Sequence, residues 1–238
     1  MIWSDFGIVI SSRRYGEKYK IVDVFTKTHG RSSGLIQNSN KNNLSIFSNV
    51  YVTWSSKSNG SLGFWKIQNE KQNWTYVLNK KESLLIFQSI CFILDKVLPY
   101  GVVNEAIFNF INFLASEIYR FTKLEALNLY AYFEFILLNS VGYGFDIEKC
   151  AICGKKEDVH FLSPKTGHGA SNNCVASVYS NKLFEIPKSW NDWNKNDFSY
   201  IDKDNIKNSL YITGYFIEQN IIQTDNYFRD SIIELLAA

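Results

Sequence analysis

Apolar and polar residues alternate in short runs through the first eighty residues of the chain. Runs rich in β-branched and aromatic side chains occupy residues 3–10, 19–26, 34–37, 44–54 and 62–68. Alternation of this kind indicates strands with one buried face. Between the last two runs stands Ser58-Asn59-Gly60-Ser61, where Asn-Gly is a strong hairpin signal. Five short strands suit a small closed barrel of the OB type, although an SH3-like barrel or an open sheet fits the strand count almost as well.

Two further turns are predicted inside this strand-rich segment. Residues 13–18 form a connection with Gly16 as its hinge, and His29-Gly30-Arg31 forms the next turn.

The hydrophobic period changes to that of helices from residue 81 onward. Apolar positions recur at helical spacing over residues 83–98, 104–121, 123–141, 203–223 and 226–236, with Pro and Gly punctuation between them. A cysteine-bearing insertion occupies about 146–175, and the polar segment 188–203 is expected to be a mobile loop. The predicted fold is therefore α+β: a five-stranded barrel over residues 1–80, followed over 81–238 by an all-α bundle with a cysteine hairpin insertion.

Charge is divided unevenly between these two parts. Residues 1–80 hold 11 Lys and Arg against 4 Asp and Glu, whereas residues 81–238 hold 14 against 19. A basic module of this kind points to an anionic polymer or membrane surface as its partner, and in a small barrel we expect nucleic acid. The candidate DNA-binding residues cluster within 29 residues and could line one face of the barrel with its rims: Arg13, Arg14, Lys18, Lys20, Lys27, Arg31 and Lys41.

Aromatic side chains in the same segment could stack on bases. The candidates are Tyr15, Phe47, Tyr51, Trp54 and Phe64, and the alternation does not say which of them face the barrel core.

Several classes of protein are excluded. The longest apolar stretches contain charged residues, as in 83–98, so they are amphipathic helices and not membrane spans. No signal segment opens the chain, which leads us to expect a cytoplasmic protein. The three histidines, His29, His160 and His168, stand outside any catalytic motif, and no Gly-rich phosphate loop is present. The sequence therefore predicts a protein that is not an enzyme.

The cysteine insertion resembles half of a zinc site. Cys150 and Cys153 form a CxxCG knuckle, and Cys174 stands where a fourth ligand would lie. The third ligand position is held by Ser171, whose hydroxyl is a poor zinc ligand. His168 or His160 could complete a Cys3His site. The alternative is a metal-free hairpin held by packing of Ile152, Val159, Phe161 and Leu162, so a zinc cofactor is possible but not required.

Several motifs resemble those of RecO, the bacterial recombination mediator. The N-terminal signature is the strand Gly7–Ile10, the turn Arg14-Tyr15-Gly16-Glu17, the strand Ile21–Thr26 and the turn His29-Gly30-Arg31. The CxxCG knuckle, Phe161–Pro164 and Cys174 resemble the zinc hairpin of that family, and the segment after Arg229 resembles its closing helix. The chain departs from the family pattern at Ser171 and at Asn226-Tyr227-Phe228, where a Leu-Pro pair is common.

The resemblance implies a fold and a function. RecO-like proteins have an OB barrel, a helical bundle and the hairpin, and they are not enzymes. They bind single- and double-stranded DNA, anneal complementary strands, and with RecR help RecA replace the single-strand binding protein SSB. Partners implied for this chain are DNA, RecR and the acidic C-terminal tail of SSB, in the bacterial cytoplasm at the nucleoid. Such a tail needs an apolar pocket rimmed by Lys or Arg, for which Arg120 and Lys123 beside Phe121 are candidates.

A different function remains open from the residues alone. A barrel-plus-helix adaptor that binds RNA, or a module whose basic face docks an acidic protein, would carry the same charge pattern.

Overall fold

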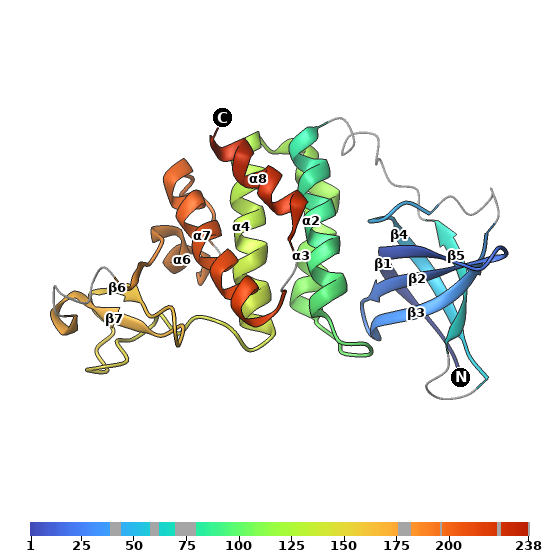
Figure 1. Cartoon of the computed structure of the whole chain (residues 1–238), viewed down its shortest axis with the longest axis horizontal. Coiled ribbons are helices and arrows are strands. Elements are labelled where there is room, and N and C mark those ends of the chain that lie inside the picture. The colour runs from blue at the N-terminus through green and yellow to red at the C-terminus, as the bar shows by residue number, and fades with distance from the viewer. Residues whose placement is uncertain are drawn as a thin grey trace. The chain divides into compact units, whose positions relative to one another are not determined.

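Figure 1 shows the computed structural model of the chain, which describes residues 1–38, 44–57, 62–69, 80–175, 182–195, 197–222 and 225–237. It divides into two compact units. Unit 1 is Met1–Arg120 with Asn226–Ser231, and unit 2 is Phe121–Asp225 with Ile232–Ala238. The division of the sequence into domains at residue 80 stays a prediction.

Five strands close into a barrel in the order β1-β2-β3-β5-β4 (Figure 1). They are β1 (Ile2–Tyr15), β2 (Tyr19–Thr26), β3 (Gly30–Gln37), β4 (Asn49–Ser55) and β5 (Gly63–Asn69). The long strand β1 pairs with β4 through its first half and with β2 through its second half, and β5 closes the barrel by running parallel to β3. This is the order of an OB-type barrel. The predicted α+β class with an N-terminal five-stranded barrel is confirmed, and closure excludes the open sheet.

The barrel interior is filled by β-branched side chains and one tryptophan. Val9, Val22, Val24 and Val52 are fully buried there, and Trp65 donates from Nε1 to the carbonyl oxygen of Val22 at 2.9 Å. Alternate positions on each strand supply this core, as the period of two in the sequence predicts.

Two details of the barrel differ from the sequence prediction. Pairing of β1 with β2 continues to Tyr15, opposite Tyr19, so Arg13 and Arg14 lie in a strand and the turn is confined to residues 16–18. Strand β3 begins at Gly30, so Arg31 also lies in a strand and not in a turn. The predicted Ser58–Ser61 hairpin lies outside the described residues, but the strands on either side of it, β4 and β5, do pair antiparallel.

Two helices pack on the barrel within unit 1. Helix α2 (Lys81–Val97) is followed by α3 (Glu105–Glu117) and a 3-10 turn, η1 (Ile118–Arg120). Asn104 caps α3, because its side chain accepts from the Ile107 N–H. The rings of Phe47 and Phe87 lie 4.0 Å apart, and those of Phe25 and Phe108 lie 5.6 Å apart. These contacts cover part of the outer barrel surface, so that only the remaining surface is open to a ligand.

Unit 2 is built around two helices, α4 (Lys123–Ser140) and α7 (Lys203–Asn220), which lie side by side (Figure 1). The cysteine insertion forms strands β6 (Val159–Leu162) and β7 (Gly169–Ser171), followed by the 3-10 turn η2 (Asn172–Cys174). A strand that the sequence did not predict, β8 (Phe184–Glu185), extends this hairpin to a three-stranded sheet. The last helix, α8 (Tyr227–Ala237), contributes residues to both units.

The expectation of a mobile loop over residues 188–203 is wrong for its first part. Residues Lys188–Trp193 form helix α6, and both of its tryptophans are buried. Trp190 donates from Nε1 to the Ser209 hydroxyl at 3.1 Å, and its ring lies 4.4 Å from that of Phe145. Burial of two large rings outweighs the polar composition of the segment.

Among the described residues, no helix is both long enough and apolar enough to span a bilayer.

Candidate nucleic-acid interface

The tip of the β1–β2 hairpin carries a group of three cations, of which Arg14 and Lys18 are exposed and Lys20 is half-buried. Arg14 lies directly opposite Lys20 across the two strands, and Lys18 stands in the turn between them. Like charges opposite each other across strands destabilise a hairpin by several tenths of a kcal/mol, roughly 0.2–1. Among the described residues, none of these three cations has an ion pair. An anionic ligand would therefore relieve the repulsion between Arg14 and Lys20.

The side of the hairpin that carries these cations is defined by the strand period. Lys20 lies two residues before Val22, which faces the barrel interior, so Lys20 and Arg14 stand on the side of the hairpin that continues this interior beyond the barrel's end. Arg13 lies on the other side. Its side chain is exposed and reaches Asp23, with 3.7 Å between Nη1 and Oδ2.

The predicted cluster of seven cations is not one surface. Lys27 follows the far end of β2, seven residues from Lys20, which corresponds to roughly 23 Å along an extended strand. Lys41 lies outside the described residues. The cations therefore separate into the hairpin-tip group (Arg14, Lys18 and Lys20) and a more distant Lys27.

Arg31 is not available to a phosphate, which corrects the expectation that it is one of the DNA contacts. Only 6% of its surface is exposed. Its Nη2 lies 2.7 Å from Asp23 Oδ2 and 2.6 Å from Asp95 Oδ1, and it donates to the Tyr100 hydroxyl at 3.1 Å. Its Nη1 donates to the carbonyl oxygens of Asp95 and Leu98. The guanidinium is thus neutralised inside unit 1 and joins β3 to the end of α2.

Asp23, the buried partner of Arg31, stays ionised. Burial acts to raise the pKa of Asp23, but hydrogen bonds from Ser33 and Arg31, together with the positive charges of Arg31 and Arg13, outweigh it and lower the pKa below its usual value.

Acid should therefore destabilise unit 1. Because the folded-state pKa of Asp23 is lowered, its contribution to stability is complete above the unfolded-state pKa of about 3.9 and is lost as pH falls through the lower folded-state pKa. Asp5, which accepts hydrogen bonds from Thr28 and Phe6 and also has a lowered pKa, adds to the same trend. Urea midpoints measured between about pH 5 and pH 2 should fall steadily. A constant midpoint over that range would contradict the assignment.

The structure separates the five candidate aromatic residues. Tyr15 and Phe64 are exposed, whereas Phe47 is part of the core. Tyr51 is half-buried, with its ring 5.0 Å from that of Phe6, and Trp54 is half-buried and donates to the carbonyl oxygen of Ser33. Sequence reasoning missed Tyr100, an exposed aromatic beside the barrel, because it lies in a helix-ending Pro-Tyr-Gly segment and its contact with β3 is long-range.

The three hairpin cysteines come together in unit 2. The sulfur atoms of Cys150, Cys153 and Cys174 all lie within 4.8 Å of one another. Ser171 is buried beside them: its N–H donates to Cys150 Sγ at 3.4 Å, and its Oγ lies 3.9 Å from Cys153 Sγ. The hydrogen bond of the Ser171 hydroxyl, together with backbone N–H groups, lowers the pKa of Cys150 to about 6. Ser171 likewise acts to lower the pKa of Cys174, but the neighbouring cysteines and burial raise it overall.

No histidine joins this group in the described part of the chain. His168 pairs with Asp146 at 3.9 Å, and His160 pairs with Asp158 at 2.9 Å. The Cys3His site that the sequence left open as an alternative is therefore not assembled in the described part of the chain. In the metal-free alternative, Ile152 was expected to help pack the hairpin, but its side chain is largely exposed.

The donor set fits a zinc ion held by three thiolates. Zinc–sulfur bonds of about 2.3 Å in a tetrahedral site place sulfur atoms about 3.8 Å apart, which the cysteine spacing allows. Cys150, Cys153 and Cys174 would hold the ion, which would crosslink the two ends of the hairpin. Ser171 lies where the fourth ligand is needed and offers only a hydroxyl.

Replacing Ser171 by cysteine should tighten metal binding on the order of tenfold or more, because a neutral hydroxyl, which is a weak zinc ligand, is replaced by a thiolate, which is a strong one. Titration of the reduced protein with Co²⁺, followed through the thiolate-to-cobalt absorption bands, measures this directly. Cys91→Ala, which removes a buried cysteine of α2 remote from the hairpin sequence, is the control. If the wild type takes up no Co²⁺ while Ser171→Cys does, the native hairpin is metal-free.

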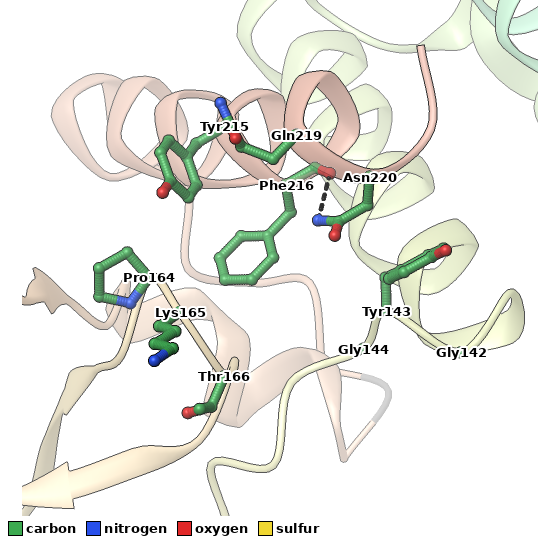
Figure 2. Close-up of a pocket in the computed structure, with 10 residues that line it drawn as sticks. All are labelled: Gly142, Tyr143, Gly144, Pro164, Lys165, Thr166, Tyr215, Phe216, Gln219 and Asn220. Carbon is green, nitrogen blue, oxygen red and sulfur yellow. Dashed lines mark hydrogen bonds between the residues drawn. The ribbon is translucent and has the colours of Figure 1, made fainter.

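A hollow of about 350 Å³ lies in unit 2 between α7, the turn after α4 and the β6–β7 turn. Figure 2 shows the Phe216 ring projecting from α7 toward the Pro164–Thr166 turn, with Tyr143 on the opposite side. Lys165 is the cation at its rim. The residues expected for a peptide pocket are elsewhere: Arg120 ends η1 and pairs with Glu117 at 2.8 Å, and Lys123 begins α4.

Sequence comparisons cover almost the whole chain. The family model described as "Recombination protein O N terminal" matches residues 1–68, and that described as "Recombination protein O C terminal" matches residues 81–223. A protein of Ehrlichia chaffeensis named "DNA repair protein RecO" is 34% identical over 99% of this chain and 98% of its own length. Proteins with the same name from Wolbachia pipientis of Culex pipiens and from Rickettsia canadensis are 32% and 28% identical over 92% and 94% of this chain, covering 91% and 90% of their own lengths.

These matches follow the order of the barrel, the helices and the cysteine hairpin from one end of the chain to the other. The chain belongs to the RecO family.

Proposed function

We propose that this chain is a non-catalytic DNA repair protein that binds single- and double-stranded DNA through its barrel. The observation that carries the proposal is the hairpin-tip group, where Arg14 and Lys20 face each other with no acidic partner among the described residues. Cations of this kind engage phosphates without reading base sequence. The names of the relatives support a role in repair.

Membership of the family supports a further set of proposals. The protein anneals complementary strands and, together with RecR, helps RecA to load onto DNA coated by SSB. It acts in the bacterial cytoplasm, in association with the nucleoid. Annealing needs no nucleotide hydrolysis, because pairing of the strands is itself favourable once their mutual phosphate repulsion is reduced.

The proposed function is tested by annealing. Two complementary oligonucleotides, one with a fluorophore and one with a quencher, are mixed with the protein in the absence of nucleotide. We expect faster quenching with the protein present, for every sequence pair tried. Binding to RNA in preference to DNA, or failure to bind either, would instead favour an adaptor that recognises RNA or an acidic protein.

The hollow of unit 2 supports a site for the acidic tail of SSB. An acidic and hydrophobic tail needs an apolar surface beside a cation. The exposed ring of Tyr143 and the half-buried ring of Tyr215 supply the apolar surface, and Lys165 supplies the cation (Figure 2).

Lys165→Glu should weaken binding of a fluorescein-labelled SSB tail peptide about fivefold to tenfold, since a partly exposed charge pair is worth about 1 kcal/mol. Fluorescence anisotropy measures the dissociation constant, and Lys188→Glu on α6 is the control. If Lys165→Glu leaves the dissociation constant of the peptide unchanged and Lys123→Glu raises it, the peptide site lies at the start of α4 instead.

A further inference from the structure

One end of the barrel opens into an aromatic pocket of about 590 Å³ that lies wholly within unit 1. Trp3 of β1 and Trp54 of β4 are register partners, and their rings stack with centroids 5.6 Å apart. Leu62, at the start of the β5 segment, and Tyr100, after α2, complete the apolar lining, and Ser32 and Ser33 add hydroxyl groups. We name this feature the mouth pocket.

Tyr100 is an exposed ring held in a fixed position. Its side chain is among the exposed aromatics, at 56%. Its hydroxyl accepts from Arg31 Nη2 at 3.1 Å and donates to Asp23 Oδ2 at 3.3 Å. The guanidinium carbon of Arg31 lies 4.4 Å from the ring centroid, so a cation covers one face. The rest of the Tyr100 ring is open to a ligand, and the ring is held in place by these contacts.

The segment that carries Tyr100 is itself tied to the barrel. The Gly101 N–H donates to the carbonyl oxygen of Arg31 at 2.8 Å. Gly30 has a φ of +65°, and a Cβ at this position would lie 2.2 Å from the carbonyl oxygen of Val102. Only glycine therefore allows the segment to approach β3 this closely. Because the pocket wall is ordered in advance, a ligand loses little binding free energy in ordering it.

The chemistry of the lining selects a neutral, flat group with polar edges. Arg31 is the charged residue of the lining, and Asp23 and Asp95 neutralise it. The other lining groups are aromatic rings, an aliphatic side chain, a glycine and two serines. A pocket of this volume is in the range of small-ligand sites. A nucleobase matches it, with one face for stacking and edge groups for the Ser32 hydroxyl.

Cations stand at the same end of the barrel for the phosphates that flank such a base. Lys27 is exposed and lies two residues before His29, whose ring stacks on Trp3 at 4.0 Å. Lys57 is exposed and lies two residues after the end of β4. Neither has an ion pair with another described residue.

We propose that the mouth pocket receives one unstacked base of single-stranded DNA, which stacks on Tyr100. This inference rests on the DNA binding proposed above and adds a preference to it. Bases of a duplex are paired and stacked on their neighbours, so they do not enter. The hairpin-tip group binds phosphates of either form of DNA, whereas the mouth pocket favours the single strand.

The test compares a mixed-sequence oligonucleotide with its duplex for three variants. Tyr100→Leu should weaken single-strand binding roughly 5- to 150-fold, from about 1–3 kcal/mol for one stacked base, and leave duplex binding unchanged. Tyr100→Phe keeps the ring but loses the two hydrogen bonds that fix it, so its single-strand affinity should lie between those of the wild type and of Tyr100→Leu. Tyr211→Leu removes a comparably exposed tyrosine of α7, at 64%, and should change neither constant.

The outcomes separate the pocket from the proposed function. Equal losses on single strand and duplex would show a structural role for Tyr100 and overturn the pocket, as would no loss on either. A wild type that binds no DNA would overturn both proposals together. Photocrosslinking of the wild type to an oligonucleotide containing 5-bromodeoxyuridine does not depend on a folded variant. Crosslinks at Trp3, Trp54 or Tyr100 support the pocket, and crosslinks confined to other residues, such as an aromatic of unit 2, overturn it.

Discussion

Arg31→Ala should lower the free energy of unfolding of unit 1 by about 3–5 kcal/mol, the range observed when one partner of a buried charge pair is removed. The substitution leaves Asp23, whose side chain is fully buried, without its principal cation, and Asp95 without its partner from β3. It also removes the donor to the Tyr100 hydroxyl and the cation over that ring. Arg31→Lys should restore only part of this stability. An ammonium group cannot reproduce the planar fork, in which Nη2 contacts both carboxylates while Nη1 donates to the carbonyl oxygens of Asp95 and Leu98.

Urea unfolding followed by circular dichroism measures this effect. Arg14→Ala is the matched control: it removes an arginine from the same barrel, but an exposed one, and should shift stability by no more than about 0.5 kcal/mol. If the Arg31→Ala protein is as stable as the wild type but binds DNA more weakly, Arg31 contacts phosphates. That result would contradict the structural role assigned from its burial.

A variant with Arg14, Lys18 and Lys20 all replaced by glutamine should have a weaker salt dependence of DNA binding. Each phosphate neutralised contributes about −0.7 to the slope of log K against log salt for a single strand. Loss of three contacts therefore makes the slope about 2 units shallower. The advantage of the wild type in affinity should grow roughly 20-fold as salt falls from about 200 to about 50 mM. The loss should be similar for all base sequences, because phosphate contacts carry no sequence information.

Fluorescence anisotropy with a mixed-sequence oligonucleotide over a salt series measures both slopes. Lys188, Lys203 and Lys207 of unit 2, replaced together by glutamine, are the matched control for net charge, since all three are exposed. Equal slopes for the hairpin variant and the wild type would remove the hairpin tip from the interface. A slope that changes in the control instead would place DNA on unit 2.

The two experiments distinguish cations that contact DNA from cations that stabilise the fold, which the sequence alone does not tell apart. Arg14 and Arg31 are both arginines of the basic N-terminal segment, and both fall in motifs shared with the family. The strand register places Arg14 opposite Lys20 at an open hairpin tip, whereas Arg31 faces Asp23 and Asp95 in the interior of unit 1. We therefore expect Arg14 to act mainly on DNA affinity and Arg31 mainly on stability.

The cysteine hairpin shows a similar division. The CxxCG spacing predicted a pair of thiols on one turn, and Cys174 joined them as expected. The histidines did not, because each has a closer carboxylate, His168 with Asp146 and His160 with Asp158. Spacing along the chain cannot choose between such partners.

Local patterns in the sequence were sufficient for the architecture of this protein. The period of two in residues 1–69 and the helical period from residue 81 each reflect contacts that a strand or helix makes along its own length, so the barrel strands and the main helices could be predicted. The Asn, Asp and Lys of residues 188–193 misled this reasoning, because the burial of Trp190 and Trp193 depends on α7 and on Phe145.

Only the tertiary structure decided which functional side chains are exposed. Arg31 is buried by Asp95 and Tyr100, which lie 64 and 69 residues away in the chain, and the same contacts fix Tyr100 at the mouth of the barrel. No periodicity within one strand records a partner at that distance. The basic character of the barrel could therefore be predicted from the sequence. The separation of its cations into a hairpin tip that we propose binds phosphates and a structural arginine required the folded chain, because burial and ion pairing are set by long-range packing.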